Sequence, residues 1–500
     1  MGVDQVGADF SSGLLDAQEH GTWKMRGKSR ICRLTGKIWG KEIAMAGKIA
    51  HAAERKWFEL ALNGVMKRAQ GKRNEGYVEV INAIEKVLGD GWPPSAYESL
   101  RDAFGSDGKW SQYFDRLLER ADLQYLKGLV MAFGFEGGFT GFRQTRKNAE
   151  KYGCGIPWII LFDPTSACNL HCTGCWASEY SRTLNLSFEE MDRLVTEGKE
   201  LGIHAYIMTG GEPMVRKKDI VRLAEKHSDC GFMLFTNGTL VDQDFCDDMK
   251  RCRNIVLSMS IEGNRDATDL RRGDGTFDKV MAAMDLLREN GLVYGTSICY
   301  TRANCEAVTS DEFLDFLIDK GVSFSWYFHF MPIGMDTGME LVPTVEQREY
   351  MYHRIREIRG FEGGKPIFCM DFQNDGEFVS GCIAGGKYYC HINPNGDVEP
   401  CVFIHYSGAN IHDKPLLECL QQPLFKAYQE GQPFNENLLQ PCPMLENPEK
   451  LKEMVIRTGA KSTDMMEPES CDHLCTKCSH YAEEWGERAE KLWRASHPGI

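Results

Sequence analysis

The sequence predicts an α/β protein: a partial (β/α)6 TIM-like barrel between an all-helical N-terminal region and a small cysteine-rich C-terminal region. Three observations support this fold class. Helical periodicity fills the first 150 residues, apolar strand-like runs alternate with helical patterns up to about residue 340, and Gly, Pro and Cys become frequent after about residue 365. A chain of 500 residues is also too long for one hydrophobic core. We therefore expect three domains, at residues 1–150, 151–340 and 341–500.

The N-terminal region is expected to consist of helices only. Apolar residues recur at three- and four-residue steps from about Leu34 to Ala69, which predicts a long amphipathic helix. Shorter helical patterns follow at residues 77–88, 95–104, 110–120 and 123–133.

The same region is strongly basic. Between Lys24 and Arg73 there are 14 Lys and Arg against three acids, a local charge of about +11, whereas the whole chain carries −14. This basic helix, with Trp39 and Trp57, is expected to bind an anionic membrane surface reversibly. The alternative is that both Trp side chains pack inside the protein and the charges form a solvated face.

Six apolar runs of strand length follow, each separated from the next by a helical pattern. Parallel strands joined by right-handed helical crossovers would form a partial barrel, whose chemistry gathers at the carboxyl ends of the strands. The expected strands are Ile156–Phe162, Ala205–Met208, Phe232–Phe235, Ile255–Ser260, Tyr294–Tyr300 and Phe324–Phe330, and the expected helices are Ser187–Leu201, Lys217–Lys226, Asp242–Arg251, Phe277–Glu289 and Ser310–Asp319.

The composition points to a globular protein of a reducing compartment. The chain is 42% hydrophobic and 26% charged, no apolar run approaches the roughly 18 residues that span a bilayer, and the N-terminus lacks the apolar core of a signal peptide. Nineteen Cys without an export signal indicate thiols and metal ligands more than disulfides, and hence a cytoplasmic, possibly membrane-associated protein. No phosphate-binding glycine motif and no base-stacking aromatic platform is evident, so no nucleic-acid partner is expected.

The most informative motif is Cys168-x3-Cys172-x2-Cys175, directly after the first predicted strand. Three thiolates can hold three corners of a cubane iron–sulfur cluster and leave the fourth iron open to a substrate or cosubstrate. A structural zinc knot or a set of unrelated buried thiols is the alternative.

The spacing and the aromatic Trp176 that follows it resemble the signature of radical S-adenosylmethionine (SAM) enzymes. In that family the open iron chelates SAM, which is then split to a 5′-deoxyadenosyl radical. The second predicted strand ends in a glycine-rich segment that matches the family's SAM-binding GGEP motif, and the fourth ends in a segment similar to one that contacts the cofactor. The resemblance implies these cofactor-binding residues: Trp176, Thr209, Gly210, Gly211, Glu212, Pro213, Ser260, Glu262 and Arg272, the last near the SAM carboxylate or as a structural clamp.

The C-terminal region resembles the auxiliary-cluster domains called SPASM or, when shortened, twitch. Cys382 and Cys401 bracket a Gly396-x4-Cys hairpin, but the full SPASM block of four closely spaced cysteines is missing. The resemblance implies at least one auxiliary cluster, held by Cys382, Cys401 and Cys442 and completed by Cys475 or Cys478. A zinc site at Cys471, Cys475 and Cys478 is the alternative.

The resemblance implies an enzyme that abstracts a hydrogen atom from an unactivated C–H bond, with a flavodoxin or ferredoxin as reductant. Because of the basic helix, the expected substrate is a membrane lipid chain, in a C–C coupling or reduction. A peptide- or protein-modifying maturase and a non-enzymatic iron–sulfur electron carrier are the alternatives. His329, Asp371 and Asp375 follow or precede predicted elements near the barrel mouth and are candidate catalytic residues.

Overall fold

The computed structural model describes residues 36–69, 73–88, 94–105, 108–335, 337–360 and 364–497. They fall into two compact units, Met1–Ser111 and Gln112–Ile500. The domain boundaries expected at residues 150 and 340 stay predictions. The side chain of Trp39 lies outside what the structure describes.

The described part of the first unit is helical, as predicted. Helix α2 (Gly36–Ala69) is the longest, and Trp57 and Leu60 on it expose 47% and 59% of their surface. Among the described helices, none combines the length and the apolar character that crossing a membrane requires. The remaining helices are α3 (Arg73–Leu88), α4 (Pro94–Phe104) and α5 (Lys109–Arg120), whose last residues belong to the second unit.

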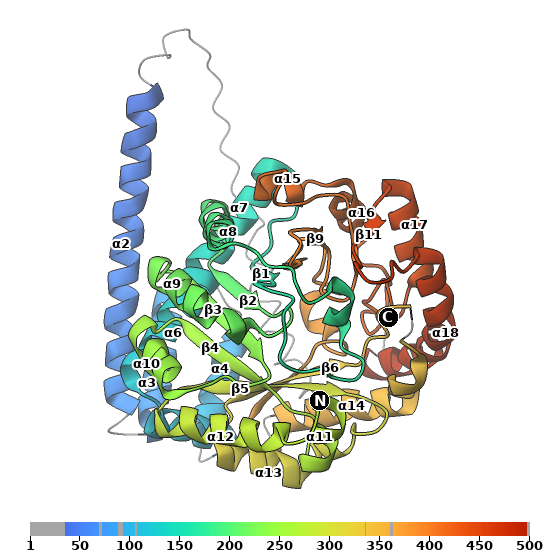
Figure 1. Cartoon of the computed structure of the whole chain (residues 1–500). Coiled ribbons are helices and arrows are strands. Elements are labelled where there is room, and N and C mark those ends of the chain that lie inside the picture. Colours follow the sequence, from blue (N-terminus) through green and yellow to red (C-terminus); the bar gives the residue numbers. More distant parts are fainter. Residues whose placement is uncertain are drawn as a thin grey trace. The chain divides into compact units, whose positions relative to one another are not determined.

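The second unit is built on one mostly parallel sheet of nine strands, in the order β7-β6-β5-β4-β3-β2-β1-β8-β9 (Figure 1). Neighbouring strands from β7 to β8 pair in parallel, and only β9 is antiparallel. The six predicted strands are all present, so the expected α/β barrel is confirmed. Their bounds are β1 Ile159–Phe162, β2 Ala205–Met208, β3 Gly231–Thr236, β4 Ile255–Ser260, β5 Tyr294–Tyr300 and β6 Phe324–His329.

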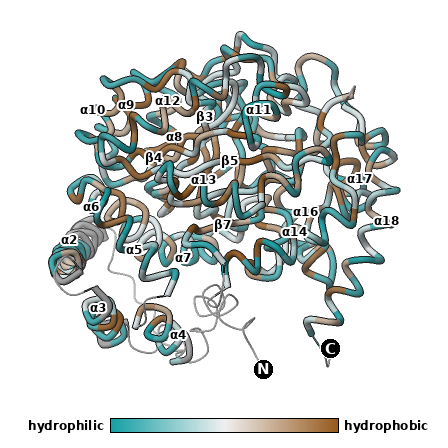
Figure 2. The backbone as a smooth tube through the Cα atoms, turned by 90° about the horizontal axis from the view of Figure 1, so that it is seen from below, coloured by the Kyte–Doolittle hydropathy of each residue, from teal (hydrophilic) through white to brown (hydrophobic). Residues whose placement is uncertain are grey.

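Alternate strand residues enter two different cores, because successive side chains of a strand point to opposite faces. Ile160 and Tyr206 join a large cluster with the surrounding helices, whereas Leu161 and Ile207 join a second cluster with the C-terminal region. Figure 2 shows the hydrophobic stretches along strands such as β3 and β5. The covering helices are α8 Phe188–Leu201, α9 Lys217–Lys226, α10 Gln243–Cys252, α11 Arg265–Arg272, α12 Thr276–Glu289, α13 Asp311–Lys320 and α14 Val345–Arg359.

The C-terminal region adds three strands to the barrel sheet. Strands β7 (Phe368–Asp371), β8 (Tyr389–Ile392) and β9 (Val398–Glu399) were not predicted. They are only two to four residues long, too short for a readable period. The rest of the region contains α15 Leu416–Leu420, α16 Pro423–Gly431, α17 Pro448–Thr458, α18 Cys471–Ser496 and the small ribbon β10 Tyr406–Ser407 with β11 Lys461–Ser462.

A second difference lies before the barrel. The helix expected at residues 123–133 is α6 (Leu123–Leu129), which continues as a wide π-helical segment, Val130–Gly141, into α7 (Phe142–Tyr152). The segment carries several glycines, which read as helix breakers in the sequence. Its Gly141 is required by space, since an added Cβ would lie 2.6 Å from the carbonyl oxygen of Gly202.

Candidate functional site

Three cysteines lie on the loop that follows the carboxyl end of β1. Cys168, Cys172 and Cys175 are half-buried free thiols, called here the first thiol trio. The Arg182 guanidinium fixes this loop, because it donates to the carbonyl oxygens of Cys168 (3.2 Å) and Leu170 (2.9 Å). The Leu170 N–H also points at Cys168 Sγ, at 3.4 Å. The predicted ligands are thus gathered at the edge where barrel enzymes carry their chemistry.

The surroundings of these thiols oppose their ionisation. Burial raises the pKa of Cys168 to about 11, with smaller contributions from Glu212 and the other two thiols. Burial also raises the pKa of Cys172, although Arg272 and Arg271 oppose it. A cationic metal centre removes this penalty, because it binds thiolates and neutralises their mutual repulsion. The donor set therefore fits an iron–sulfur cluster with three protein ligands.

The turn after β2 is built against the cysteine loop. Gly210 has a φ of +100°, and an added Cβ on Gly211 would lie 2.2 Å from the carbonyl oxygen of Ala167. The N–H groups of Gly211 and Glu212 donate to the carbonyl oxygens of Thr165 (2.9 Å) and Ala167 (2.8 Å). Only glycine permits this approach of two chains. Pro213 then opens a short 3-10 helix, Pro213–Arg216.

Two side chains of this segment are engaged within the protein. Thr209 Oγ1 donates to Asp163 Oδ1 at 2.8 Å and so ties β2 to the residue that follows β1. The buried Glu212 carboxylate accepts from Thr236 Oγ1 (2.5 Å), the Asn237 N–H (2.8 Å) and the Met214 N–H (3.0 Å). Its contact with the ammonium group of a cofactor stays a prediction.

Glu262, after β4, is the centre of a buried charge cluster beside the first thiol trio. Its Oε1 accepts from Arg271 Nη1 (2.6 Å), Arg272 Nε (2.9 Å) and Arg272 Nη2 (2.6 Å). Its Oε2 and Arg271 Nε are buried, yet neither has a hydrogen-bond partner among the described residues. Arg272 therefore acts as a clamp on Glu262. The two unpaired polar atoms fit a polar ligand such as SAM, since buried polar groups are normally satisfied.

Two further residues of this edge differ in how well the sequence predicted them. Ser260, a predicted cofactor contact, ends β4 and is half-buried. Cys299, which was not among the predicted site residues, is half-buried on β5 and faces the charge cluster. Burial raises its pKa to about 11, opposed by Arg271, and the Cys175 thiol contributes. Sequence reasoning missed both Arg271 and Cys299, because neither belongs to a local motif.

Three more cysteines form a second thiol trio: Cys382, Cys401 and Cys442. Burial raises the pKa of Cys382 to about 12, and Cys401 contributes. Burial, Glu446 and the other two thiols raise the pKa of Cys442 well above its ordinary value. The buried Tyr428 hydroxyl has no hydrogen-bond partner among the described residues, and all three thiols act on it. The predicted auxiliary ligands are therefore together, and they fit a second cluster by the same donor chemistry.

The predicted fourth ligands lie elsewhere in the C-terminal region. Cys475 and Cys478 share one face of α18 with Cys471, since the three are spaced four and three residues apart. The main neighbours of Cys475 are Glu449 and Ser479, and no described contact joins it or Cys478 to the second trio. In the parts of the chain with described side chains, no three Cys, His, Asp or Glu are close enough to hold a single metal ion.

A buried polar network connects the surroundings of the two trios. His391 on β8 lies 3.1 Å from Asp163 Oδ2 and 2.6 Å from Glu399 Oε2 through its two ring nitrogens. Tyr180 donates to the same Glu399 at 2.8 Å. Although burial opposes its charge, Asp163 and Glu399 raise the pKa of His391 to about 9. Trp176, next to Cys175, packs edge-on against His391, with ring centroids 5.8 Å apart.

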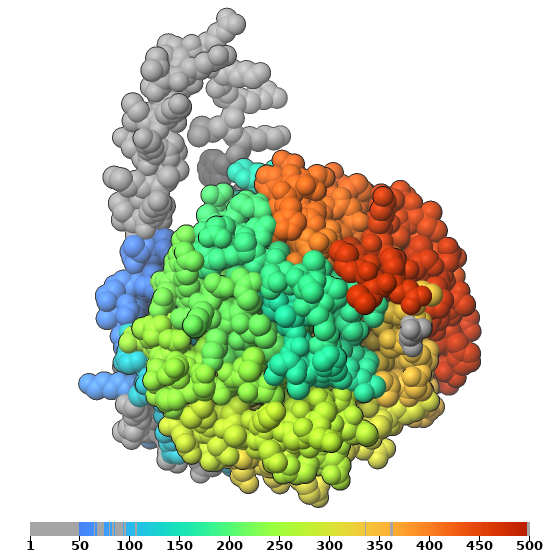
Figure 3. Space-filling model, viewed as in Figure 1, coloured from blue at the N-terminus to red at the C-terminus, as the bar shows by residue number. Residues whose placement is uncertain are grey.

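A chain of aromatic rings also runs between the two trios on the inner face of the sheet. Trp176 contacts Phe403 (6.5 Å between centroids), Phe403 contacts Phe372 (6.3 Å), and Phe372 contacts Phe328 on β6 (5.4 Å). Phe328 also meets Phe235 on β3, at 5.7 Å. Trp176, Phe235, Phe328 and Phe372 are half-buried, so this apolar lining is partly accessible. Figure 3 shows the sea-green segment after β1 bordering the orange and red C-terminal part.

Of the three candidate catalytic residues, His329 and Asp371 are buried and Asp375 is half-buried, and all three have partners within the protein. His329 Nε2 lies 2.8 Å from the Tyr481 hydroxyl, and burial and then Arg348 lower the pKa of His329 well below its ordinary value. Burial and then Asp375 raise the pKa of Asp371 to about 6, and Asp375 forms an ion pair with Arg359. No described contact joins them to either trio, and their catalytic role stays a prediction.

The comparisons with known proteins agree with this geometry. A family model described as "Radical SAM superfamily" matches residues 162–303, and one described as "Iron-sulfur cluster-binding domain" (SPASM) matches residues 382–444. The chain is 27% identical over 290 residues to an AdoMet-dependent heme synthase of Nitratidesulfovibrio vulgaris, covering 52% of this chain and 77% of the relative. It is 27% identical over 277 residues to the mycofactocin maturase MftC of Mycolicibacterium smegmatis, covering 52% and 67%.

The solved structure of Streptococcus suis SuiB bound to precursor peptide SuiA has a similar fold. It aligns with a TM-score of 0.50 and 19% identity, over 62% of this chain and 76% of SuiB. At this identity the likeness supports the fold alone.

Proposed function

Because the chain belongs to the radical SAM superfamily and carries a C-terminal SPASM iron–sulfur domain, we propose that it modifies a peptide or protein at an unactivated C–H bond. When bound at the first thiol trio, the [4Fe–4S] cluster and SAM supply a 5′-deoxyadenosyl radical that abstracts a hydrogen atom. An electron donor such as a flavodoxin or ferredoxin is part of the proposal. The chain itself contributes ligands, orientation and exclusion of water.

The residues around the first trio have distinct tasks in this proposal. Cys168, Cys172 and Cys175 hold the cluster. The turn of Gly210 and Gly211 holds the end of β2 against the cysteine loop, and the buried Oε2 of Glu262, which lacks a partner among the described residues, would face a polar group of the cofactor. Arg271 and Arg272 fix the position of Glu262, since they share its other oxygen.

The observation that carries the proposal is the partly accessible aromatic chain between the two thiol trios. It links Trp176, beside Cys175, with Phe403, two residues after Cys401. A substrate side chain that lies on these rings would be apolar or aromatic and would lie close to both cluster sites. Ligand sites are commonly apolar surfaces of this kind with a few polar groups at one end. A cluster held by Cys382, Cys401 and Cys442 would supply an electron acceptor or an anchor for such a substrate.

A named relative supports a peptide substrate over a lipid, since one matching relative is a mycofactocin maturase. Other matching relatives are named as heme synthases, so an extended aromatic substrate is also compatible with the lining.

Anaerobic reconstitution tests the reaction. With dithionite, the wild-type chain should cleave SAM to 5′-deoxyadenosine, and Cys172→Ala should not. Cys252→Ala, a change at a half-buried thiol on α10, is the control and should keep the activity. Cleavage by Cys172→Ala at the wild-type rate would contradict the proposal.

Deuterium transfer tests the substrate class. Perdeuterated candidate peptides, including short precursors encoded next to this gene, should pass deuterium into 5′-deoxyadenosine. Vesicles with perdeuterated acyl chains should not. Transfer from the lipid alone would replace the peptide proposal by the lipid one.

A lipid-chain substrate is the second candidate, and exposed residues on α2 favour it. Trp57 and Leu60 lie three residues apart and expose 47% and 59% of their surface on a helix within the basic segment. Reversible docking on an anionic membrane would give such a chain access to acyl tails.

Vesicle flotation tests the docking. The full chain should float with vesicles of anionic lipid at low salt and lose binding in the double variant Trp57→Ser, Leu60→Ser. Asn63→Ala, an exposed change on the same helix, is the control. Equal flotation of all three proteins, or flotation of none, would remove this candidate.

A further inference from the structure

A hollow lies at the edge of the sheet opposite to the first thiol trio. Its lining includes Val293 and Tyr294, where β5 begins, and Ser323, just before β6 begins. Because β1 and β5 run parallel within one sheet, this is the amino-terminal edge, whereas the first thiol trio follows the carboxyl end of β1. The hollow therefore does not belong to the site described above.

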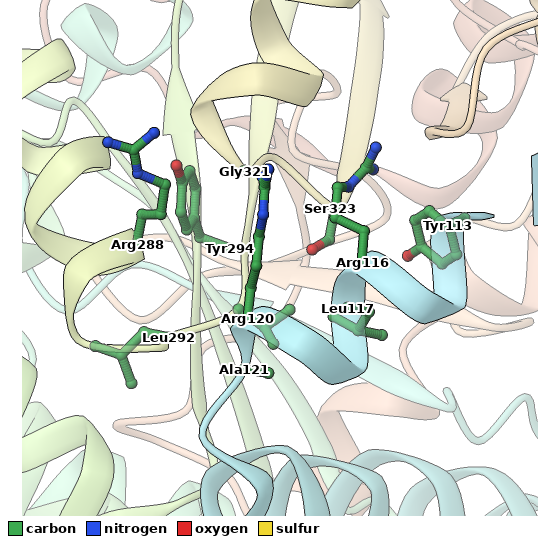
Figure 4. Close-up of a pocket in the computed structure, with 11 residues that line it drawn as sticks. Tyr113, Arg116, Leu117, Arg120, Ala121, Arg288, Leu292, Tyr294, Gly321 and Ser323 are labelled. Carbon is green, nitrogen blue, oxygen red and sulfur yellow. The ribbon is translucent and has the colours of Figure 1, made fainter. Parts of the chain in front are cut away.

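Three arginines from two helices meet in this hollow. Figure 4 shows Arg116 and Arg120 rising from α5 toward the Gly321–Ser323 segment, while Arg288 approaches from α12. A Cβ on Gly321 would lie 3.4 Å from Arg288 Cδ and 3.7 Å from Arg120 Nη1, so these two side chains flank the same glycine.

The arginines use few of their donors on the protein. Arg116 Nη2 donates to the Pro366 carbonyl oxygen at 2.6 Å, and Arg120 Nη1 donates to that of Ile318 at 3.3 Å. Arg288 Nη1 donates to the Asp319 carbonyl oxygen at 3.3 Å, and its Nη2 lies 3.3 Å from Asp285. A guanidinium carries five N–H donors, so most of them face the hollow or solvent.

The local charges are not balanced. Four cations, the three arginines and Lys320, lie near two acids, Asp285 and Asp319. Lys320 and Arg288 both form ion pairs with Asp285, and Asp319 acts on Arg116. Burial and then the neighbouring Arg120 lower the pKa of Arg116. Cations that crowd each other in this way attract a counter-ion of opposite charge.

A purely structural explanation accounts for part of this arrangement. Arg120 and Arg288 bind carbonyl oxygens in the last turn of α13, where cations are favoured by the helix dipole. It does not account for Arg116, whose hydrogen bond goes to Pro366 and which packs over the Tyr113 ring at 5.8 Å. Nor does it explain why three guanidinium groups share one hollow.

We propose that this hollow binds an oxyanion, a phosphate or carboxylate group of a small ligand, at the end of the barrel away from the radical chemistry. Arg116, Arg120 and Arg288 would donate to its oxygens, because a guanidinium matches such groups in pairs of parallel hydrogen bonds. The Tyr294 hydroxyl already donates to the Lys320 carbonyl oxygen at 2.6 Å, so it shapes the wall and is not a donor to the ligand.

Calorimetric titration of the anaerobically purified holoenzyme tests the site, with inorganic phosphate and succinate as separate probes. Saturable binding of one of them is expected, and the stronger probe identifies the ligand group. Arg116→Gln and Arg288→Gln should each weaken binding about tenfold or more, the size expected for a charged hydrogen bond. Arg251→Gln, an exposed ion-paired arginine on α10, is the matched control and should leave the affinity unchanged.

A second variant keeps the test independent of folding losses. Leu117→Glu places a carboxylate among the arginines, so it should abolish binding of the probe while all three arginines are retained. Lack of saturation by either probe, or wild-type affinity in all three pocket variants, would overturn the proposal. If the arginine variants unfold at lower temperatures but keep the wild-type affinity, the arginines only stabilise the last turn of α13.

Discussion

The two thiol trios have the same donor atoms but different surroundings. Beside Cys172 lie two arginines and Glu262, which has a buried oxygen without a partner among the described residues. Beside Cys442 lie Tyr428 and Glu446, and the Glu446 carboxylate is already bound to the Cys442 N–H and to Arg348. At the first site the Oε2 atom of Glu262 has no partner among the described residues and could bind a polar group of an exchangeable cosubstrate. At the second site the Glu446 carboxylate already has partners within the protein. Under the proposed function, equal ligands would therefore serve a centre that binds a cosubstrate and one that does not.

The largest expected difference follows from removing one thiol of each trio. Cys172→Ala should abolish SAM cleavage, because the first cluster cannot form with two ligands. Cys382→Ala should keep cleavage of SAM to 5′-deoxyadenosine but lose the modified product. Chromatography of 5′-deoxyadenosine and iron counts per chain check both outcomes. If Cys382→Ala also stops SAM cleavage while the first cluster remains loaded, the second trio is needed for SAM cleavage too, which would contradict the roles given to the two sites.

Removing the charge of Glu262 should weaken SAM binding. Glu262→Gln leaves Arg271 and Arg272 buried without their anionic partner and disturbs the polar group that faces the cofactor. We expect the KM for SAM to rise about tenfold or more with unchanged iron content. Glu225→Gln, at an exposed ion pair with Arg251, is the control. An unchanged KM in Glu262→Gln would mean that the open oxygen does not face SAM.

The His391 network between the trios should make stability depend on pH. Its pKa is about 9 in the folded chain against about 6.5 unfolded, so the charged form is favoured by folding. This contribution, about 3 kcal/mol at most by linkage, is fully present below pH about 6.5 and is lost as pH rises through about 9. Denaturant midpoints measured across that range should fall in the wild type and fall less in His391→Gln. If the denaturant midpoints of the two proteins fall equally with pH, His391 is not the titrating group.

The smallest expected effect is that of Tyr428→Phe. It deletes a hydroxyl that faces all three thiols of the second trio and changes little volume. The rate of SAM cleavage should change less than about twofold, while the EPR spectrum of the auxiliary cluster shifts. An unchanged auxiliary spectrum would show that Tyr428 is not beside a cluster.

Local patterns predicted much of the fold and of the first site. The six barrel strands are mostly apolar runs separated by helical patterns, and the cysteine and glycine motifs each lie on one turn at a strand end. The strands β7 to β9 were missed because they are short and contain polar residues such as His391 and Glu399. Arg271 was also missed, since its role depends on Glu262 nine residues earlier and on thiols from another strand. Sequence reasoning likewise could not see that Asp163, His391 and Glu399 meet, because their contact is created by the pairing of β1 with β8.

The central claim is that the first thiol trio holds a cluster with one iron open to SAM. Mössbauer spectra of anaerobically purified Cys382→Ala protein, recorded with and without SAM, test it most directly, because the auxiliary signal is then reduced. We expect one iron subsite of a cubane cluster to change when SAM is added, and no such cluster in Cys172→Ala. A spectrum without a cubane cluster at the first trio, or one that SAM leaves unchanged, would contradict the account.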